Sequence, residues 1–321
     1  MYKVIMAPTE GLDTERYAIS VATHLAQRFD AELRLVRVEA APIGLETLNP
    51  VAVAAAEEAL RESRLARLRK LEALGAECRG LGEIRVITAL EDGAAAPTLC
   101  DYASRFKVDL IVMSSHARGG ISRFALGSVA DYLIRRADVP VLIVKPGVTL
   151  SGGKPGETFN RIVVPLDGSS LAEQILPQVA ALASRLNATV SLLHVLTPLT
   201  YSQKEIMQPG LPWWDTDIAI ADEYLTRAAS YLTEVGLAVS KDVVLSEHIP
   251  SAILDYASRS RADLIAIASS GAGGVGRFVF GSVADEVTRK SQTSLLVFHP
   301  KKTATRTTNT ERLVAEPYAG V

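Results

Sequence analysis

The sequence is poor in cysteine, contains no long hydrophobic run and has no excess of charge of either sign. Its two cysteines, Cys78 and Cys100, form no CxxC pair, which is typical of the reduced thiols of a cytosolic protein. No segment approaches the ~20 apolar residues that a membrane-spanning helix needs, and the opening "MYKVIMAPTEG" lacks the apolar core of a signal peptide. We therefore expect a soluble, cytoplasmic protein with no membrane partner.

Charge and histidine content exclude further classes. Lys and Arg total 34 and Asp and Glu total 36, which gives a formal net charge of −2 at pH 7. A nucleic-acid-binding protein usually has a clear excess of basic residues, so we expect no nucleic-acid partner. The five histidines show no spacing typical of metal ligands, and no Ser–His–Asp set can be argued. We predict neither a metal site nor catalytic residues.

What the sequence does contain is one unit that occurs twice. Four segments of the first half return in the second. "YKVIMAPTEG" (2–11) matches "NRIVVPLDGS" (160–169), where individual residues such as Pro8 and Pro165 are mostly 157 positions apart. The other three return 154 positions later: "DYASRFKVDLIVMSSH" (101–116) as "DYASRSRADLIAIASS" (255–270), "SRFALGSVAD" (122–131) as "GRFVFGSVAD" (276–285), and "VPVLIVKP" (139–146) as "TSLLVFHP" (293–300). Because the offset changes so little along the repeat, the two halves must share their topology.

Each half alternates short apolar segments with helical ones. In the second half, apolar, β-branched segments predict strands at 161–166, 188–196, 242–247, 263–269 and 294–299. Apolar residues at helical spacing predict helices over 169–187, 222–236 and 251–262, and another that begins in the "GSVAD" segment. Strands that are apolar on both faces and separated by helices are typical of a parallel sheet covered on both sides.

The predicted fold class is therefore α/β, with two tandem doubly wound parallel-sheet domains. We expect the first domain at 1–147 and the second at 160–300. The segment 148–159 between them is rich in Gly, Pro, Ser and Thr, which is typical of a linker. Residues 301–321 lack apolar periodicity, and we predict a disordered tail.

Ligands of open α/β sheets bind beyond the carboxyl ends of the strands, and two loops there are informative. The first, "PLDGSS" (165–170), places the Asp167 carboxylate where it could accept hydrogen bonds from a ribose or an adenine amino group. The alternative is a tight turn in which Asp167 caps the next helix. Ser170 and Glu173 also give that helix the start of a capping box. The residues alone leave both readings open.

The second loop combines several glycines with a Gly281–Ser282 pair that opens a helix. Glycine lets backbone N–H groups approach phosphate oxygens closely, and the free N–H groups of a helix N-terminus favour an anion. The alternative is again structural, because Ser282 with Asp285, like Ser128 with Asp131, forms an S-x-x-D capping box that could start a helix without a ligand. A G-x-G-x-x-G spacing also occurs in this loop, but it lies in the last βα turn. The dinucleotide-binding motif belongs in the first βα turn, so this position argues against a dinucleotide cofactor.

Together these features resemble the universal stress protein family in its tandem, two-domain form. The resemblance is carried by the strand-PxDGS-helix pattern, the helix before "DLIVM", the glycine loop, "GSVA" and the closing "PVLIV". It implies an adenine nucleotide α-hydrolase-like fold and the binding of ATP or AMP, with Mg²⁺ as an optional companion. The residues that correspond to the family's nucleotide site are Pro165, Asp167, Val195, Ala268, Gly271, Gly281, Ser282 and Val283.

Two of these positions need comment. In nucleotide-binding members the last loop reads G-x2-G-x9-G-[S/T], and Ala268 stands where the first glycine of that pattern belongs. At Val195 the resemblance implies that the backbone, not the side chain, meets the adenine.

The first half fits this pattern less well. Gly127 and Ser128 match, but Ser114 and Ala117 replace the earlier glycines, and Glu10 replaces the aspartate. An alanine held at φ > 0 costs about 1 kcal/mol, and the added hydroxyl and longer carboxylate would crowd the same cavity. We therefore expect nucleotide mainly in the second domain, with Gly127 and Ser128 forming a weaker candidate site.

The resemblance implies a stress-response nucleotide sensor or regulator rather than an enzyme, because efficient hydrolysis needs a water-activating base and a charge clamp that are not evident here. Two alternatives stay open: a scaffold of the same fold that docks protein partners without nucleotide, and an adenylating enzyme of a related fold. In the family the closing strand often forms a dimer edge. We therefore expect "VPVLIV" and "SLLVFH" to pair within one chain, with a homodimer of whole chains as a further option.

Two other segments have structural predictions. Trp213 and Trp214 are expected to fill a domain interface rather than to cover a nucleotide. The charge-rich segment 57–75 is expected to be a helix with a solvated face and i,i+4 ion pairs rather than a coiled coil.

Overall fold

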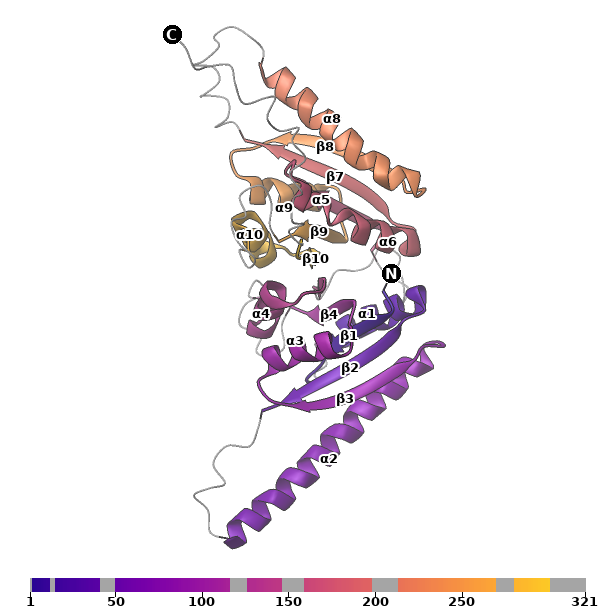
Figure 1. Ribbon diagram of the computed structural model, residues 1–321, viewed down its shortest axis with the longest axis vertical. Coiled ribbons are helices and arrows are strands. Elements are labelled where there is room, and N and C mark those ends of the chain that lie inside the picture. Colours follow the sequence, from indigo (N-terminus) through magenta and orange to yellow (C-terminus); the bar gives the residue numbers. More distant parts are fainter. Residues whose placement is uncertain are drawn as a thin grey trace, which may run out of the picture.

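The computed structural model describes residues 2–11, 15–40, 50–115, 126–145, 159–197, 213–269 and 280–300. Among these residues each half builds the predicted alternation of strands and helices (Figure 1). The first half contains β1 (Val4–Pro8), α1 (Arg16–Phe29), β2 (Glu32–Glu39), α2 (Pro50–Gly80), β3 (Val86–Asp92), α3 (Ala95–Arg105), β4 (Leu110–Ser114), α4 (Ser128–Arg136) and β5 (Val141–Val144). The second contains β6 (Arg161–Pro165), α5 (Ser170–Glu173), α6 (Leu176–Leu186), β7 (Thr189–Leu196), α8 (Trp213–Glu234), β8 (Val239–Leu245), α9 (Ile249–Arg259), β9 (Leu264–Ala268), α10 (Ser282–Lys290) and β10 (Ser294–Phe298).

Three predicted elements of the second half illustrate how the extents differ. The single helix expected over 169–187 is two helices, α5 and α6, and Pro177 lies in the first turn of the second, where its missing N–H costs no helical hydrogen bond. The helix expected over 222–236 already begins at Trp213. The strand expected over 242–247 is β8, which starts at Val239, where its pairing with Val190 of β7 begins.

The ten strands among the described residues form one sheet, in the order β3-β2-β1-β4-β5-β10-β9-β6-β7-β8. Neighbours within each half pair in parallel, for example β1 with β4 and β6 with β9. The closing strands β5 and β10 pair antiparallel, which confirms their predicted pairing within one chain and leaves neither as an exposed edge. Figure 1 shows the two halves stacked through this junction, with β3 and β8 at the far ends.

A pseudo-twofold axis relates the two halves at this junction. Leu142 of β5 pairs with Leu296 of β10, and the same two leucines occupy equivalent positions of the repeat, 154 residues apart. The axis therefore passes between them. A residue near the axis that contacts the other half has an equivalent in the repeat that faces the corresponding place across the junction, so the two contacts can be compared directly.

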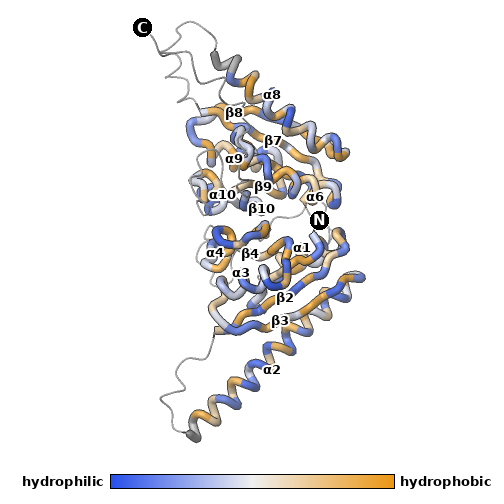
Figure 2. The backbone as a smooth tube through the Cα atoms, viewed as in Figure 1, coloured by the Kyte–Doolittle hydropathy of each residue, from blue (hydrophilic) through white to orange (hydrophobic). Residues whose placement is uncertain are grey.

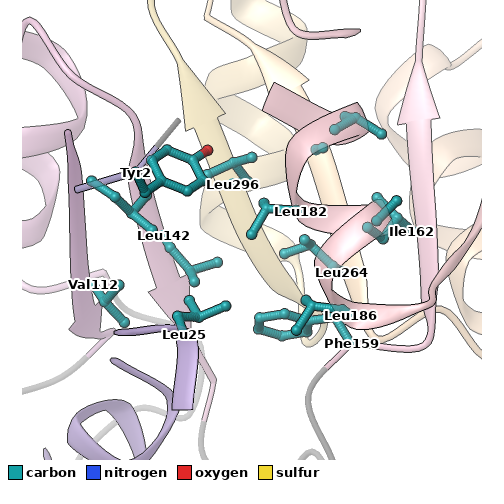
Figure 3. Close-up of a cluster of buried hydrophobic side chains, with 14 of the residues drawn as sticks. Tyr2, Leu25, Val112, Leu142, Phe159, Ile162, Leu182, Leu186, Leu264 and Leu296 are labelled. Carbon is teal, nitrogen blue, oxygen red and sulfur yellow. The ribbon is translucent and has the colours of Figure 1, made fainter. Parts of the chain in front are cut away.

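Helices cover both faces of the sheet. Residues of α1, α2, α6 and α8 pack on one face and residues of α3, α4, α9 and α10 on the other, with successive strand residues alternating between the two clusters. Figure 3 shows part of the first cluster at the junction, where Tyr2 and Phe159, which are equivalent in the repeat, lie with Leu25 and Leu182. The Tyr2 hydroxyl donates to Gln178 Oε1 of the other half at 2.7 Å. The core is thus continuous across the two halves.

The long helix α2 is longer than the predicted 57–75 and largely exposed along its N-terminal part. Figure 2 shows polar residues along much of it, whereas the strands are mostly hydrophobic. Leu71 and Cys78 are buried against the sheet. Arg64 and Arg67 pair with Glu39 at the end of β2. These two ion pairs connect α2 to the sheet, whereas the sequence predicts i,i+4 pairs within the helix. None of the helices among the described residues combines the length and hydrophobicity that crossing a bilayer requires.

Candidate functional site

The candidate site lies at the carboxyl ends of β6, β7 and β9. From β6 the chain moves outward to β7 and β8, and then returns to β9 and β10 on the other side of β6. The strand order therefore reverses between β6 and β9, which is where the loops of an open α/β sheet diverge and bind ligands. The loop after β6 carries Pro165 and Asp167, and α10 begins at Ser282 after β9. The topology thus brings these separately predicted residues to one edge of the sheet.

The loop after β6 is a tight turn closed by its own side chains. Asp167 Oδ1 accepts hydrogen bonds from the Ser169 N–H (3.0 Å) and the Ser169 hydroxyl (2.6 Å). Ser169 Oγ in turn accepts from the Ala172 N–H at 3.1 Å and is the N-cap of α5. The N-cap is Ser169, so the predicted capping roles of Asp167 and Ser170 are both wrong. Asp167 instead accepts hydrogen bonds from this cap residue. Asp167 itself is exposed at the sheet edge.

The end of β7 borders this turn. The β6–β7 ladder ends at the pair Pro165–Leu193. Val195 lies two residues further along β7, so the edge of its backbone that faces β6 is not part of that ladder. His194 Nδ1 contacts Leu166 O at 2.8 Å, and its ring stands edge-on to Tyr224 of α8, with 5.9 Å between ring centroids. His194 and Tyr224 therefore fix the turn and β7 relative to each other, and the adenine contact of the Val195 backbone stays a prediction.

Among the described residues, the start of α10 is joined to the end of β9 by a backbone hydrogen bond and has no side-chain cap. The Gly281 N–H donates to Ser269 O at 2.7 Å, so Gly281 lies beside the end of β9. Gly281 is the N-cap of α10, with φ −64° and ψ 145° and no side-chain cap hydrogen bond. Ala268, just before this link, is buried at 8% exposure and pairs with Phe298 of β10. Gly271, the middle glycine of the predicted pattern, lies outside the described residues.

The predicted S-x-x-D capping boxes are wrong in both halves. Ser282 and Ser128 are the first helical residues rather than the caps, and the caps are Gly281 and Gly127. The first hydrogen bond within α10 is donated by the Asp285 N–H to Gly281 O (2.8 Å). The N–H groups of the residues before Asp285 therefore have no acceptor within the helix, as in the first turn of any α-helix. Val283, the last predicted site residue, is one of these.

The first half fills the equivalent loop with its own carboxylate. Glu15, only 4% exposed, accepts hydrogen bonds at Oε2 from the Thr9 hydroxyl (2.8 Å) and from the N–H groups of Glu10 (2.8 Å) and Gly11 (3.2 Å). At the equivalent position, 157 residues later, the second half has Ala172. A buried anion thus already occupies the turn that corresponds to the Asp167 loop. The exchange of Glu for Ala between the repeats is the sequence signal that could have revealed it.

Arg37 closes the same loop from β2. Its NH1 donates to Glu10 O at 2.6 Å, and a Cβ on Gly11, which has φ +81°, would meet that nitrogen at 3.1 Å. The GS turn of the first half, by contrast, repeats that of the second: the Gly127 N–H donates to Ser115 O at 2.9 Å and Ser128 is exposed. Among the described residues, the two halves therefore differ at the loop after the first strand and not at the helix start. Ala117 lies outside the described residues.

The comparisons with known proteins agree with this fold and repeat. A family model described as the universal stress protein family matches residues 1–145 and, a second time, residues 158–299. The chain belongs to the universal stress protein family. The two matches show its tandem form.

Individual universal stress proteins are similar over one half or both. One from Methanocaldococcus jannaschii is 33% identical over 147 residues, which is 45% of this chain and 83% of that protein. One from Mycobacterium tuberculosis is 25% identical over 231 residues, 70% of this chain and 72% of that protein. A crystal structure from Archaeoglobus fulgidus covers 92% of this chain and 98% of its own, with a TM-score of 0.60 and 18% identity. Two shorter universal stress proteins, one in complex with cAMP and one with dAMP, each cover 44% of this chain with a TM-score of 0.33.

His299 is a residue of this universal stress protein that the sequence did not single out. Its Nδ1 lies 2.7 Å from Ser269 Oγ at the end of β9, and its Nε2 contacts Ile134 O in the last turns of α4, across the junction. Burial lowers the pKa of His299, although the Ile134 carbonyl acts in the opposite direction. A neutral imidazole with its proton on Nε2 satisfies both contacts. His299 therefore ties the base of the second half's loop to the first half.

Lys145 occupies the equivalent position in the first half. Its amine is buried, burial lowers its pKa, and it has no hydrogen-bond partner among the described residues. The Thr288 hydroxyl, which is equivalent to Ile134, is likewise buried without a described partner. The two halves therefore differ in how they complete the junction. No group of three or more His, Cys, Asp or Glu side chains in the described part of the chain could hold a metal ion.

Proposed function

We propose that the second domain of this universal stress protein binds an adenine nucleotide, ATP or AMP, and that the chain acts as a stress-response sensor or regulator. The observation that carries the proposal is the position of Gly281–Ser282, which start α10 where the strand order of the sheet reverses. The N–H groups of Ser282 and Val283 would bind phosphate oxygens. Pro165 and Asp167 would border the adenosine, and the backbone of Val195 would meet the adenine.

The glycine at the start of α10 supports this role. With φ −64° and ψ 145°, Gly281 has a backbone conformation that any residue adopts. The fold therefore does not require a glycine there for conformational reasons. A missing side chain leaves space for a ligand to reach the first N–H groups of the helix.

The proposal assigns one nucleotide to each chain. In the first domain the Glu15 carboxylate takes the backbone N–H groups of Glu10 and Gly11, so this turn is already closed by a side chain of the protein and is less available to an adenosine. Mg²⁺ would arrive with ATP, bound to its phosphates, and not at a site of the protein. We propose no catalytic role, because nothing in the described residues of the site combines a water-activating base with a cation for the γ-phosphate.

Two observations favour the alternative scaffold function. The Gly281 N–H is already bonded to Ser269 O, and Ala268 is buried against β10. Both reduce the number of backbone groups that a phosphate could use. A scaffold of this fold would dock protein partners and carry no nucleotide.

Protein purified without added ligand distinguishes the two functions. Denaturation followed by mass spectrometry should release an adenine nucleotide, and stripped protein should bind ATP or AMP in calorimetry. Gly271→Val should abolish this binding, whereas Ala117→Val, at the equivalent region of the first half, should change it little. Absence of nucleotide from the purified protein, together with no heat on adding ATP, would favour the scaffold. Equal losses from the two valine variants would contradict the assignment of the halves.

The remaining features of the organisation are part of the same proposal. We assign the domains to 1–147 and 160–300, joined by a linker at 148–159 and followed by a tail at 301–321. We also propose a cytoplasmic location and a further homodimer of whole chains. Size-exclusion chromatography with light scattering tests the last point.

A further inference from the structure

Four charged side chains link α4 to α10 across the pseudo-twofold axis. Arg135 donates from Nε to Asp131 Oδ2 on its own helix (3.0 Å) and from NH2 to Asp285 Oδ1 on α10. Arg289 donates from Nε to Asp285 Oδ2 at 3.0 Å, and its NH2 lies 3.7 Å from Asp131 Oδ1. Asp131 is equivalent to Asp285 and Arg135 to Arg289 in the repeat. The cluster is therefore a neutral set of two cations and two carboxylates.

One of these carboxylates belongs to the helix that starts the proposed nucleotide site. Asp285 lies in the first turn of α10, three residues after Ser282. Side chains three apart on a helix are neighbours, with roughly 5–6 Å between their Cβ atoms. A carboxylate stabilises a bare helix N-terminus, but it would repel a phosphate bound to the same turn. The site therefore needs a cation beside Asp285.

The first domain supplies one of the two cations. Besides its hydrogen bond to Asp285, the Arg135 guanidinium lies over the ring of Phe280, with Cζ 4.8 Å from the ring centroid. Phe280 directly precedes Gly281, so Arg135 contacts residues on both sides of the GS turn. Partial burial alone would raise the pKa of Asp285, but hydrogen bonds from Arg289 and Arg135 overcome that effect and lower the pKa. Asp285 is therefore ionised at neutral pH and depends on both arginines for its neutralisation.

We infer that Arg135 of the first domain is a positioning residue for the phosphate end of the nucleotide site in the second domain. It neutralises Asp285 and so allows the first turn of α10 to accept a polyphosphate. The inference rests on the proposed function and extends it: the domain that is not expected to bind nucleotide well completes the site of the other. Its contribution grows with the charge of the ligand, so it distinguishes ATP from AMP and adenosine.

The test is Arg135→Gln, titrated calorimetrically with ATP, ADP, AMP and adenosine at fixed salt and without Mg²⁺, so that the negative charge of the ligand rises with its number of phosphates. One unneutralised charge within about 7 Å of the phosphates, partly screened by solvent, should weaken ATP binding about 10-fold. AMP should lose less, and adenosine should bind within about twofold of its wild-type affinity. A general structural fault would weaken all four ligands alike, which would overturn the inference.

Two further variants separate charge from structure. Adding Asp285→Asn to Arg135→Gln removes the unneutralised carboxylate and should restore ATP affinity to within about threefold of wild type. Lys290→Gln removes a positive charge from the same helix, but the partner of Lys290 is Glu286 (2.6 Å), so ATP affinity should stay within about twofold. Circular dichroism and urea midpoints establish that each variant is folded.

The possible failures are distinguishable. Persistent loss of ATP affinity in the double variant would show that Arg135 does not act through Asp285, while the proposed function would stand. If Arg135→Gln bound ATP with wild-type affinity, the inference about Arg135 would be wrong, and the proposed function would again stand. If the wild-type chain bound none of the four ligands, the proposed function would fail, and this inference with it.

Discussion

Replacing Gly281 with alanine should weaken nucleotide binding without weakening the fold. The backbone at Gly281 has φ −64° and ψ 145°, which alanine adopts without strain. At the equivalent Gly127, with φ −64° and ψ 150°, an added Cβ would lie 3.4 Å from Ser115 O, the nearest described atom, which is an ordinary contact. Alanine is a poorer N-cap than glycine, but it also restricts the unfolded chain, which is worth about 0.4–1 kcal/mol. We expect the free energy of unfolding to change by less than about 1 kcal/mol.

The effect on binding should be much larger. A methyl group at residue 281 stands beside the N–H groups of Ser282 and Val283 and holds a phosphate away from them. A hydrogen bond to a charged group contributes about 1.5–3 kcal/mol, so the loss of even one such bond weakens ATP binding about tenfold or more. Calorimetry with ATP measures the binding, and urea unfolding measures the stability. Gly127→Ala is the matched control and should bind ATP within about twofold of wild type. Wild-type ATP affinity of Gly281→Ala would refute the assignment of the phosphate site to the start of α10.

Three further predictions concern the loop of the first half and the junction. Glu15→Ala removes the acceptor of the buried Thr9 hydroxyl and of the partly buried Glu10 N–H and should lower the free energy of unfolding by about 2–4 kcal/mol in urea titrations; a cost below about 1 kcal/mol would mean that this carboxylate does not hold the loop. Leu142→Ala and Leu296→Ala remove fully buried side chains at equivalent positions and should each cost about 2–5 kcal/mol, with similar values; strongly unequal urea midpoints would contradict the pseudo-twofold junction. Burial lowers the pKa of His299, so below about pH 6.5 the unfolded chain binds a proton that the folded chain does not. Stability should therefore fall between about pH 7 and pH 5, and His299→Gln should flatten that slope; an unchanged slope would contradict the buried, neutral imidazole.

Much of the fold could be predicted because its signals are local and repeated. Apolar strands alternating with amphipathic helices indicate a doubly wound sheet, and the recurrence of each segment at a nearly constant offset makes the two halves alike. The pairing of the closing strands came from the family resemblance, and the equivalence of Leu142 and Leu296 explains its register. The ends of elements were less predictable: Pro177 divides a helix that apolar spacing alone makes continuous.

The capping predictions failed because one spacing serves two purposes. An S-x-x-D pattern predicts a serine cap, but the glycine before the serine takes that position. Asp131 and Asp285 instead join Arg135 and Arg289 in a cluster that spans the two halves. Such partners lie about 150 residues away, as with Arg135 and Asp285, and no local pattern can show them. The role of the Glu15 carboxylate was missed for a related reason. Its hydrogen bonds depend on the position of Glu15 beside residues 9–11 in the folded chain, which no local pattern indicates.

The central claim is that each chain binds one adenine nucleotide, at the start of α10 in the second domain. Calorimetric titration of the full chain with ATP, after removal of any bound nucleotide, tests it most directly. One molecule of ATP per chain, with a dissociation constant on the order of micromolar (about −8 kcal/mol), is the predicted result. Two equivalent sites per chain, or no heat at high protein concentration, would contradict it.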